Sequence, residues 1–470
     1  MTRPDHRIMH GALLAVAVSL FWAQSFHSGL SGDVFWQWAA GQYMIAHHEV
    51  LHDNVFSYTL YHKPWVTEEW GYEVILAAVI KFMGPAGYWI MSAGLGTLLI
   101  GSLAWLLSLR GITGIKNGVF VLLSTPGLLP FVKDRPQTVS YVFFVVMLGI
   151  LWKSKTQPQR LWWLVPFLWL WTNVHGSFLL GFLLLGLEGL WMLIPINAAR
   201  VMTPGTRVPF KTLAITVVSA VGLSFINPNG PGLWAYAWHV SFSRRISGII
   251  AEWQSPNFHF MAFVLVILVP LFVLVLLIIL GNRRLSWPDF FLAAGLFYAT
   301  MKSVRFLPYY DLQWVVLLGT MTQDWPFRKI KGYLMAPILL GLSLVLLFDK
   351  PIIPAGTPVG EPTMAAQYLK THDGRVFNMY HWGGYLISRH IPVFIDGRTD
   401  FYLQGPQIGQ YLAVKNLKKN PNIIWKQYNV RYVLWAPKTA VSTYLLALPK
   451  EWQPIIKTKT AILFQHRESW

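Results

Sequence analysis

Six acidic side chains lie close together, between residues 28 and 73, in a chain that is otherwise basic. The whole sequence has 38 Lys+Arg against 20 Asp+Glu, so this stretch reverses the local sign of charge. Carboxylates at this density can act as general bases or bind a cation. The six, which are opposed by Lys63 alone, are Asp33, Glu49, Asp53, Glu68, Glu69 and Glu73.

Asp33 has the most demanding position of the six, because it follows the first apolar segment by only a few residues. It is expected at the outer surface of a membrane, where a carboxylate can meet a lipid headgroup. Trp36 beside it could contact substrate or anchor at the interface. The alternative is that Asp33 only caps the helix that follows. Glu68, Glu69 and Glu73 are expected to begin an interfacial helix, where negative charge complements the helix dipole.

A second acid, Asp134, is predicted at the same surface, in the short turn KDRPQ between Lys133 and Arg135. Charges this close to hydrocarbon are usually functional or paired. Asp33 and Asp134 could supply a general base and a site for Mg²⁺ or Mn²⁺. A salt-bridge cluster that marks the membrane boundary is the alternative, and clustered arginines could replace a metal.

Several cations are predicted on outer loops, where they could bind the phosphate of a substrate. Arginine suits phosphate through its planar fork of donors. The same residues could instead mark the membrane boundary. The predicted phosphate-binding residues are Arg135, Arg244, Arg245, Lys302 and Arg305.

Glu252, His175 and Trp36 complete the predicted substrate-binding set. Glu252 is a third outer carboxylate in a loop rich in tryptophan, whose faces suit sugar rings. His175 lies in the turn TNVHGSF. The histidines of HHEVLHDN match no strong zinc spacing, so we interpret them as solvated loop residues.

The elements that position these residues are predicted to be membrane helices. With 54% hydrophobic and only 12% charged residues, the chain is a polytopic α-helical membrane protein. The chain has no cysteine, so disulfides and thiolate metal sites are excluded. About eleven spans are predicted, over residues 8–27, 86–108, 118–132, 138–153, 160–174, 177–196, 211–227, 260–280, 286–301, 306–321 and 332–348.

The basic residues orient this map in the cell membrane. With a cytoplasmic N-terminus, fifteen lysines and arginines fall on inner segments and eight on outer ones. Residues 28–85 and 228–259 are then the long outer loops, and EEWGYEVILAAVIKFMG reads as an interfacial helix. The first span reads as a retained anchor.

The composition changes after residue 348, so residues 1–348 are predicted as the membrane domain and residues 349–470 as a small extracytoplasmic α/β domain. DKPIIPAGTPVGEP separates the two. Strands are predicted at RVFNM, PVFIDG, VRYVLWA and AILFQH, with helices at MAAQYLKTH and near 406–419 and 439–448. A patch including Tyr385, Asp396 and Arg398 is explained by a turn and buried ion pairs.

The arrangement resembles the GT-C superfamily of integral membrane glycosyltransferases. The segment GDVFWQWAAGQYMIAHHEVLHDNVFSYTLYHKPWVTEEWGYEVI looks like the opening of bacterial multi-spanning proteins described as glycosyltransferases or mannosyltransferases of that class. RPQTVSYVFF, WTNVHGSFLLG, INPNGPGLW, AEWQSP and YHWGGYLISRHIPVFIDGRTDFY look like further segments of the same group.

The resemblance implies transfer of a sugar from a polyprenyl-phosphate donor to an extracytoplasmic hydroxyl of an envelope glycan, lipid or protein. Asp33 and Asp134 match the two acidic positions of the pattern, although Asp33 is a single acid where the family has an adjacent pair. No WWDYG-type motif is present, so transfer of oligosaccharide to asparagine is not implied. Membrane lipids are expected partners and nucleic acid is not. The alternatives are a flippase for lipid-linked sugars and a non-enzymatic assembly protein.

Overall fold

The chain forms two compact units in a computed structural model. Unit 1 comprises Met1–His27 and Trp89–Ile352, and unit 2 comprises Ser28–Tyr88 and Ile353–Trp470. Each is described here by itself. The structure describes residues 3–30, 32–192, 202–203, 207–279, 285–325, 332–348, 350, 352–354, 356 and 358–468.

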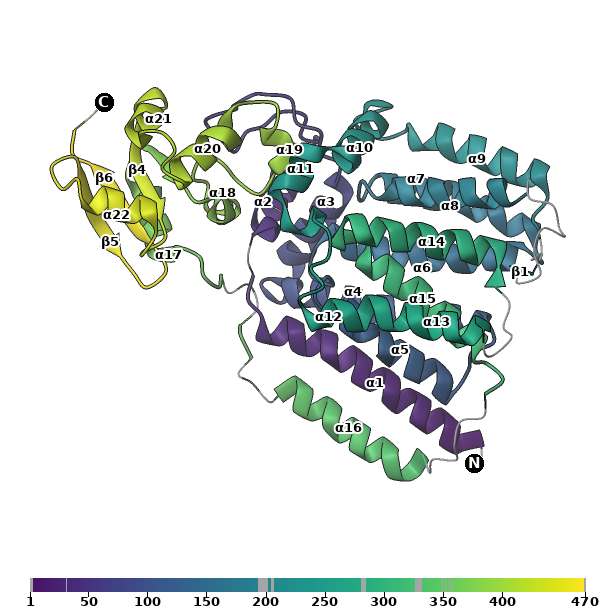
Figure 1. Ribbon diagram of the computed structural model, residues 1–470. Coiled ribbons are helices and arrows are strands. Elements are labelled where there is room, and N and C mark those ends of the chain that lie inside the picture. Colours follow the sequence, from purple (N-terminus) through teal and green to yellow (C-terminus); the bar gives the residue numbers. More distant parts are fainter. Residues whose placement is uncertain are drawn as a thin grey trace. The chain divides into compact units, whose positions relative to one another are not determined.

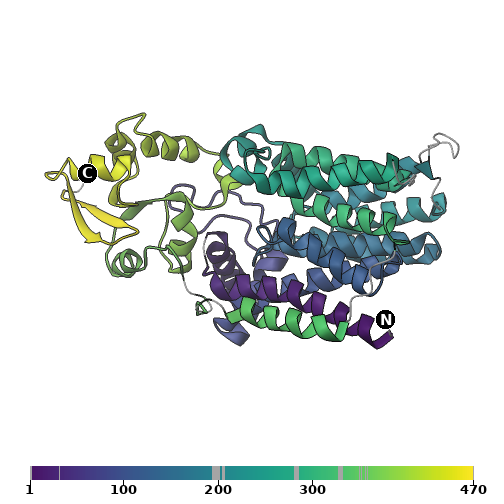
Figure 2. The same ribbon diagram turned by 60° about the horizontal axis from the view of Figure 1, so that its bottom comes forward.

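Unit 1 is a bundle of helices that run alongside one another (Figure 1). Its N-terminal helix and its last helix lie side by side in both ribbon views (Figure 2). Two short parallel strands, β1 (Met202–Thr203) and β2 (Leu285–Ser286), join its loops. The helices are α1 (Arg3–His27), α4 (Ala86–Leu109), α5 (Ile115–Leu128), α6 (Pro136–Ser154), η1 (Pro158–Trp163), α7 (Leu164–Thr172), α8 (Phe178–Trp191), α9 (Phe210–Ser224), α10 (Gly232–Phe242), α11 (Arg244–Ile249), η2 (Ala251–Trp253), α12 (Met261–Phe263), η3 (Val264–Leu268), α13 (Val269–Ile279), α14 (Trp287–Lys302), η4 (Val304–Phe306), α15 (Leu307–Met321) and α16 (Gly332–Phe348).

The eleven predicted spans fall mainly on helical residues, but fewer helices have the length and hydropathy to cross a membrane. Within the described ranges four do: His6–His27, Ala86–Leu109, Pro136–Ser154 and Met261–Ile279. Three shorter apolar helices are Phe178–Trp191, Phe210–Ser224 and Met335–Phe348. A helix needs about 20 residues to cross about 30 Å of hydrocarbon. The count of eleven therefore stays a prediction.

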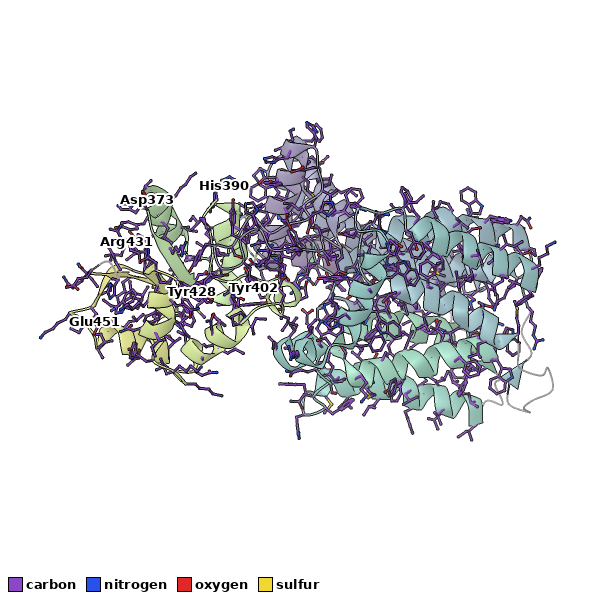
Figure 3. All side chains as sticks on the ribbon, turned by 90° about the horizontal axis from the view of Figure 1, so that it is seen from above. Asp373, His390, Tyr402, Tyr428, Arg431 and Glu451 are labelled. Carbon is purple, nitrogen blue, oxygen red and sulfur yellow. The ribbon has the colours of Figure 1, made fainter. Side chains whose placement is uncertain are left out.

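Unit 2 is an α/β unit with a four-stranded sheet in the order β3-β4-β6-β5. β3 (Arg375–Asn378) is parallel to β4 (Val430–Trp435), while β6 (Ile462–His466) is antiparallel to β4 and to β5 (Trp452–Lys457). Figure 3 labels Asp373 and Arg431 near this sheet, where the Arg431 guanidinium donates to the Asp373 carbonyl at 3.3 Å. The helices are α2 (Asp33–His47), α3 (Trp70–Met83), α17 (Thr363–Thr371), η5 (Tyr380–Trp382), α18 (Gly383–Ser388), α19 (Thr399–Tyr402), α20 (Gln407–Lys415), α21 (Pro421–Gln427) and α22 (Ala440–Leu446).

The strand predicted at PVFIDG is wrong, because this segment forms only isolated bridges. Val393 pairs once with Ser57 and once with Val376. The Asn378 side chain makes hydrogen bonds that a neighbouring strand would otherwise make. Its amide donates to the Ile395 carbonyl at 2.8 Å and accepts from the Phe394 N–H at 3.0 Å. The backbone groups are thus satisfied without a regular strand.

The first outer loop is joined to the C-terminal part by backbone hydrogen bonds. The Tyr58 N–H donates to the Val393 carbonyl at 3.2 Å, and the Val393 N–H donates to the Phe56 carbonyl at 3.2 Å. The Thr59 hydroxyl adds a bond of 2.8 Å to the Phe394 carbonyl. The sequence prediction had placed residues 28–85 with the membrane helices. In the structure, Asp33 therefore belongs to unit 2 and Asp134 to unit 1.

Candidate functional site

Asp33 is the first residue of α2, and its carboxylate is oriented by the next turn of the same helix. The Trp36 indole N–H donates to Asp33 Oδ1 at 3.1 Å. The N-cap is Gly32, with a φ of 64° that favours glycine, and it makes no side-chain capping bond. Asp33 thus complements the helix dipole from inside the first turn. The alternative that it caps α2 is wrong.

The Asp33 carboxylate lies against the C-terminal part of unit 2. A Cβ added at Gly397 would lie 2.1 Å from Asp33 Oδ1 and 3.2 Å from the Trp36 indole nitrogen. The Tyr380 hydroxyl donates to the Gly397 carbonyl at 2.8 Å. Burial raises the pKa of Tyr380, and the negative charge of Asp33 raises it further, so Tyr380 stays a neutral hydrogen-bond donor.

Glu361 is a carboxyl next to Asp33 that sequence reasoning missed. It is 7% exposed and accepts a hydrogen bond from the backbone N–H of Gly32, the residue immediately before Asp33. Burial raises the pKa of Glu361 to about 8, against the lowering effect of the Gly32 bond. No group in the described ranges hydrogen-bonds to its Oε2. Only its position in a Pro- and Gly-rich linker was visible in the sequence, and that suggested a boundary.

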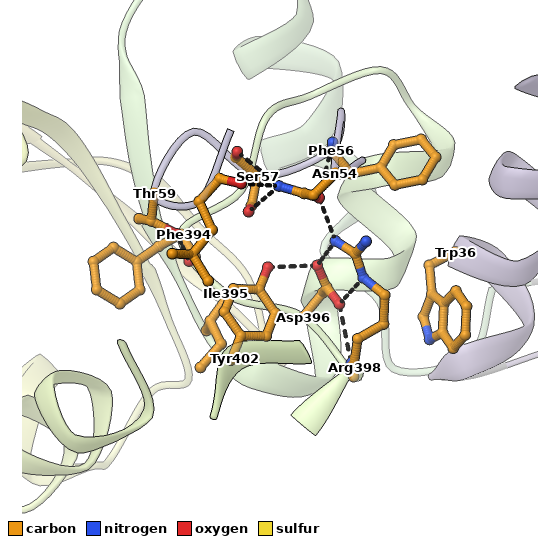
Figure 4. Close-up of polar contacts among 12 residues, drawn as sticks. Trp36, Asn54, Phe56, Ser57, Thr59, Phe394, Ile395, Asp396, Arg398 and Tyr402 are labelled. Carbon is orange, nitrogen blue, oxygen red and sulfur yellow. Dashed lines mark hydrogen bonds and ion pairs between the residues drawn. The ribbon is translucent and has the colours of Figure 1, made fainter. Parts of the chain in front are cut away.

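A buried ion pair supports this part of unit 2 (Figure 4). Arg398 and Asp396 are 2.6 Å apart, with side chains 1% and 0% exposed. The Arg398 guanidinium also donates to Asn54 Oδ1 at 2.9 Å, and the Tyr402 hydroxyl donates to Asp396 Oδ2 at 2.6 Å. The guanidinium carbon of Arg398 lies 4.4 Å from the centre of the Trp65 ring. The predicted buried ion pair is confirmed.

Glu73 lies at the start of a helix, as the sequence predicts, but its side chain is buried. It lies in the first turn of α3 but is only 1% exposed. Burial raises its pKa well above the usual range, and Glu69 adds to this effect, which Arg398 opposes. Burial thus favours the neutral carboxyl, and interaction of a charged Glu73 with the helix dipole stays a prediction.

In unit 1, Asp134 and Arg135 lie in the turn before α6. Pro136 begins the helix, and the Thr138 hydroxyl closes the turn by donating to the Lys133 carbonyl at 2.7 Å. Burial raises the pKa of Asp134, although its own backbone N–H and the neighbouring Arg135 and Lys133 charges act in the opposite direction. Arg135 pairs with Glu252 at 3.6 Å, and both side chains are partly exposed.

His175 connects the turn between α7 and α8 to this cluster. It is 4% exposed, and its Nδ1 lies 3.0 Å from the Ser140 hydroxyl on α6. Its Nε2 lies 3.4 Å from the Arg305 guanidinium. Burial lowers the pKa of His175 well below its usual range, and Arg305 lowers it further. His175 is therefore a neutral ring beside a fixed cation.

Arg305 is held by the loop that carries Glu252. The Ser303 hydroxyl donates to the Glu252 carbonyl at 3.0 Å, and the Val304 N–H donates to the Gln254 carbonyl at 2.9 Å. The Arg305 guanidinium lies 5.0 Å from the centre of the Trp253 ring. The structure thus brings together four of the residues predicted from sequence, Arg135, His175, Glu252 and Arg305.

Two of the other predicted cations, Lys302 and Arg245, are exposed. Lys302 is exposed and lies 5.9 Å from the Tyr298 ring. Arg245 is exposed on α11, and the side chain of Arg244 lies outside the described part of the structure. Trp36 is 8% exposed, and its indole donates to Asp33 while its ring packs edge-to-face against Trp65, with the ring centroids 6.0 Å apart.

The predicted metal ligands, Asp33 and Asp134, belong to different units. Among the residues that the structure describes, no three His, Asp or Glu side chains form a group that could bind a metal ion. Binding of Mg²⁺ or Mn²⁺ by these two acids stays a prediction, and the chemistry below does not depend on it.

Comparison with known proteins identifies the fold. No protein-family model matches the chain, and no curated protein matches it in sequence. It is similar to the oligosaccharyltransferase of Archaeoglobus fulgidus tethered with an acceptor peptide (TM-score 0.60, 12% identity, 98% of this chain and 74% of that one). The same enzyme, AglB, with an inhibitory peptide and a dolichol-phosphate gives a TM-score of 0.60 at 11% identity, over 94% and 71% of the two chains.

A second kind of enzyme has a similar structure over the full length. ArnT from Cupriavidus metallidurans bound to undecaprenyl phosphate matches with a TM-score of 0.51 and 13% identity, over 97% of each chain. ArnT and AglB are both GT-C membrane glycosyltransferases. At these identities the similarity establishes the architecture, so the chain has the GT-C fold.

Proposed function

We propose that the protein is a membrane glycosyltransferase that transfers a sugar from a polyprenyl-phosphate donor to an extracytoplasmic hydroxyl. The acceptor class is an envelope glycan, lipid or protein. The observation on which this rests is the cation cluster of Arg135 and Arg305 in a chain with the GT-C fold. Similar structures contain dolichol-phosphate and undecaprenyl phosphate, which are polyprenyl phosphates.

The proposed reaction forms one bond and breaks another at the anomeric carbon of the sugar. The acceptor oxygen attacks that carbon, the bond from the carbon to the phosphate oxygen breaks, and the hydroxyl proton passes to Asp33. Arg135 and Arg305 stabilise the negative charge on the departing polyprenyl phosphate. Neutral His175 holds Arg305 without adding charge.

The Arg135 contact is loose enough to exchange for a phosphate. At 3.6 Å from Glu252, with side chains 24% and 47% exposed, the pair gains little from its own attraction. A phosphate offers Arg135 two short charge-assisted hydrogen bonds in place of one long contact. Asp134 and Glu252 would then orient the acceptor.

The two rival functions are weaker. A flippase requires ionisable residues free to act within the bundle. Two of the three acids there are paired, Glu188 with Lys155 at 3.8 Å and Asp289 with Arg110 at 3.0 Å. The third, Asp311, is buried near the start of α15, and its Oδ2 has no hydrogen-bond partner in the described ranges. A non-enzymatic assembly protein would use the patch at Tyr385 and Asp396. Those side chains are 2% and 0% exposed, so a partner cannot reach them.

The test is release of polyprenyl phosphate by the purified full chain with Asp33→Asn. Loss of a general base predicts a fall of about 10² to 10⁴ in rate, with unchanged thermal stability. Asp53→Asn is the matched control, because Asp53 is an exposed acid of the same loop. Wild-type turnover by the Asp33 variant would exclude the proposed base.

A further inference from the structure

Unit 2 contains a cavity of about 990 Å³ that the proposed reaction does not use. Its lining comes from the C-terminal half of α2, from Val55 and Phe56, from the end of α3, and from residues 387–392. Asp33 is at the opposite end of α2. Since a helix rises 1.5 Å per residue, about 20 Å separates Asp33 from His47 at the cavity.

The walls of the cavity are mainly apolar and aromatic. Trp38, Ile45, Phe56, Ile80 and Ile391 are among the lining residues. The volume lies at the upper end of the range of small-molecule sites, about 300 to 1,000 Å³. The cavity thus has room for the first part of a hydrocarbon chain and the group attached to it.

The charged residues of the lining are all basic. Lys81 is a lysine of the lining, and three histidines lie with it. All four side chains are exposed: Lys81, His47, His48 and His390. Figure 3 labels His390 in unit 2. None of the six acids of the first outer loop lines the cavity. The acidic stretch of the chain therefore contributes to a cavity whose lining has no carboxylate. A lining with basic side chains and no carboxylate favours an anionic ligand.

The exposed apolar side chains of α3 indicate the source of that ligand. Phe82 is 84% exposed, and Ile75 and Met83 are also exposed, on either side of Lys81. Exposed apolar side chains that flank a lysine are typical of a helix lying in a membrane interface. The ligand is then a component of the bilayer.

We propose that this cavity binds a phosphate-bearing membrane lipid. The phosphate contacts Lys81 and the histidines, and the hydrocarbon lies against the apolar walls. Lys81 and His47 also lie in the last turns of α3 and α2, where a cation stabilises the helix dipole. A dipole role alone would affect stability and leave lipid binding unchanged, so the two can be separated.

Native mass spectrometry of the purified full chain tests the proposal. Phosphatidic acid is the anionic probe, and phosphatidylcholine and inorganic phosphate are the comparisons. The double variant Lys81→Gln with His390→Gln removes the lysine and one histidine of the lining, and Ala46→Trp fills the cavity from an exposed lining position. Lys63→Gln is the matched control, because Lys63 is an exposed lysine of the same loop outside the lining.

The wild-type chain and Lys63→Gln are expected to retain phosphatidic acid in preference to phosphatidylcholine. Each cavity variant should bind it at least about tenfold more weakly, which corresponds to the loss of one charged hydrogen bond. Equal retention of both lipids, or unchanged binding by both cavity variants, would overturn the proposal. Displacement of the lipid by inorganic phosphate would also overturn it, since the site would then recognise phosphate alone.

Discussion

Two ion pairs, one in each unit, differ in the burial of their side chains. In unit 2, Arg398 and Asp396 are 2.6 Å apart and almost fully buried. In unit 1, Arg135 and Glu252 are 3.6 Å apart and partly exposed. Asn54 accepts a further hydrogen bond from Arg398, and Tyr402 donates one to Asp396, while Arg398 Nη1 has no hydrogen-bond partner in the described ranges. A pair of the first kind fixes a structure, whereas one of the second kind can exchange a partner for a ligand.

The largest effect is expected from breaking the buried pair. Arg398→Met leaves Asp396 buried and uncompensated, which costs about 3 to 5 kcal/mol of unfolding free energy. Denaturant unfolding of the full chain measures it. Adding Asp396→Asn should restore part of the loss, because no unpaired charge then remains. A loss under about 1 kcal/mol would mean that the pair does not hold unit 2 together.

Removing a cation from unit 1 is expected to act on activity instead. Arg305→Gln loses a charged contact worth about 1.5 to 3 kcal/mol, or roughly 10- to 100-fold in kcat/KM for donor. Thermal stability should change little. Arg245→Gln is the control, because Arg245 is an exposed arginine outside the cluster that contains Arg305. Equal effects of the two variants would remove Arg305 from its proposed role.

The buried acid beside Asp33 predicts a pH dependence of stability. The folded chain holds the Glu361 proton up to about pH 8, whereas an unfolded glutamate releases it near its usual pKa of about 4.3. The unfolding free energy should therefore fall as pH rises through this window. Between pH 5 and 7 the unfolding free energy should fall by about 2.5 kcal/mol because of Glu361.

Glu361→Gln should remove that part of the pH dependence. Glu73 contributes with the same sign, so some dependence remains in the variant. Unfolding curves at pH 5 and pH 7 give the comparison. Identical slopes for wild type and variant would contradict the assignment of a proton to Glu361.

The smallest effect is expected from Glu252→Gln. An exposed pair contributes about 0 to 1 kcal/mol, so stability should hardly change. Without the Glu252 carboxylate beside it, Arg135 should bind the donor phosphate at least as well, which would leave KM for donor unchanged or lower. A clear rise in KM would show that Glu252 contacts the substrate itself.

The helices could be predicted from the sequence because long apolar runs are local signals. The turns that carry Asp134, Arg135 and His175 could be predicted in the same way, since they interrupt apolar segments, whereas binding of phosphate there stays a prediction. The strand prediction at residues 392–397 failed because Asn378 satisfies that backbone from another segment. Glu361 was missed for a similar reason, because its burial and its bond to Gly32 join residues far apart in sequence.

The space between Gly397 and the Asp33 carboxylate is too small for any side chain at position 397. Because a single added carbon would lie 2.1 Å from the carboxylate, the position of Asp33 depends on the absence of a side chain at a residue far away in the sequence. Gly397→Ala would shift the Asp33 carboxylate without altering its chemistry. The chain thus offers one methyl group as a way to separate the position of this carboxylate from its proposed action as a base.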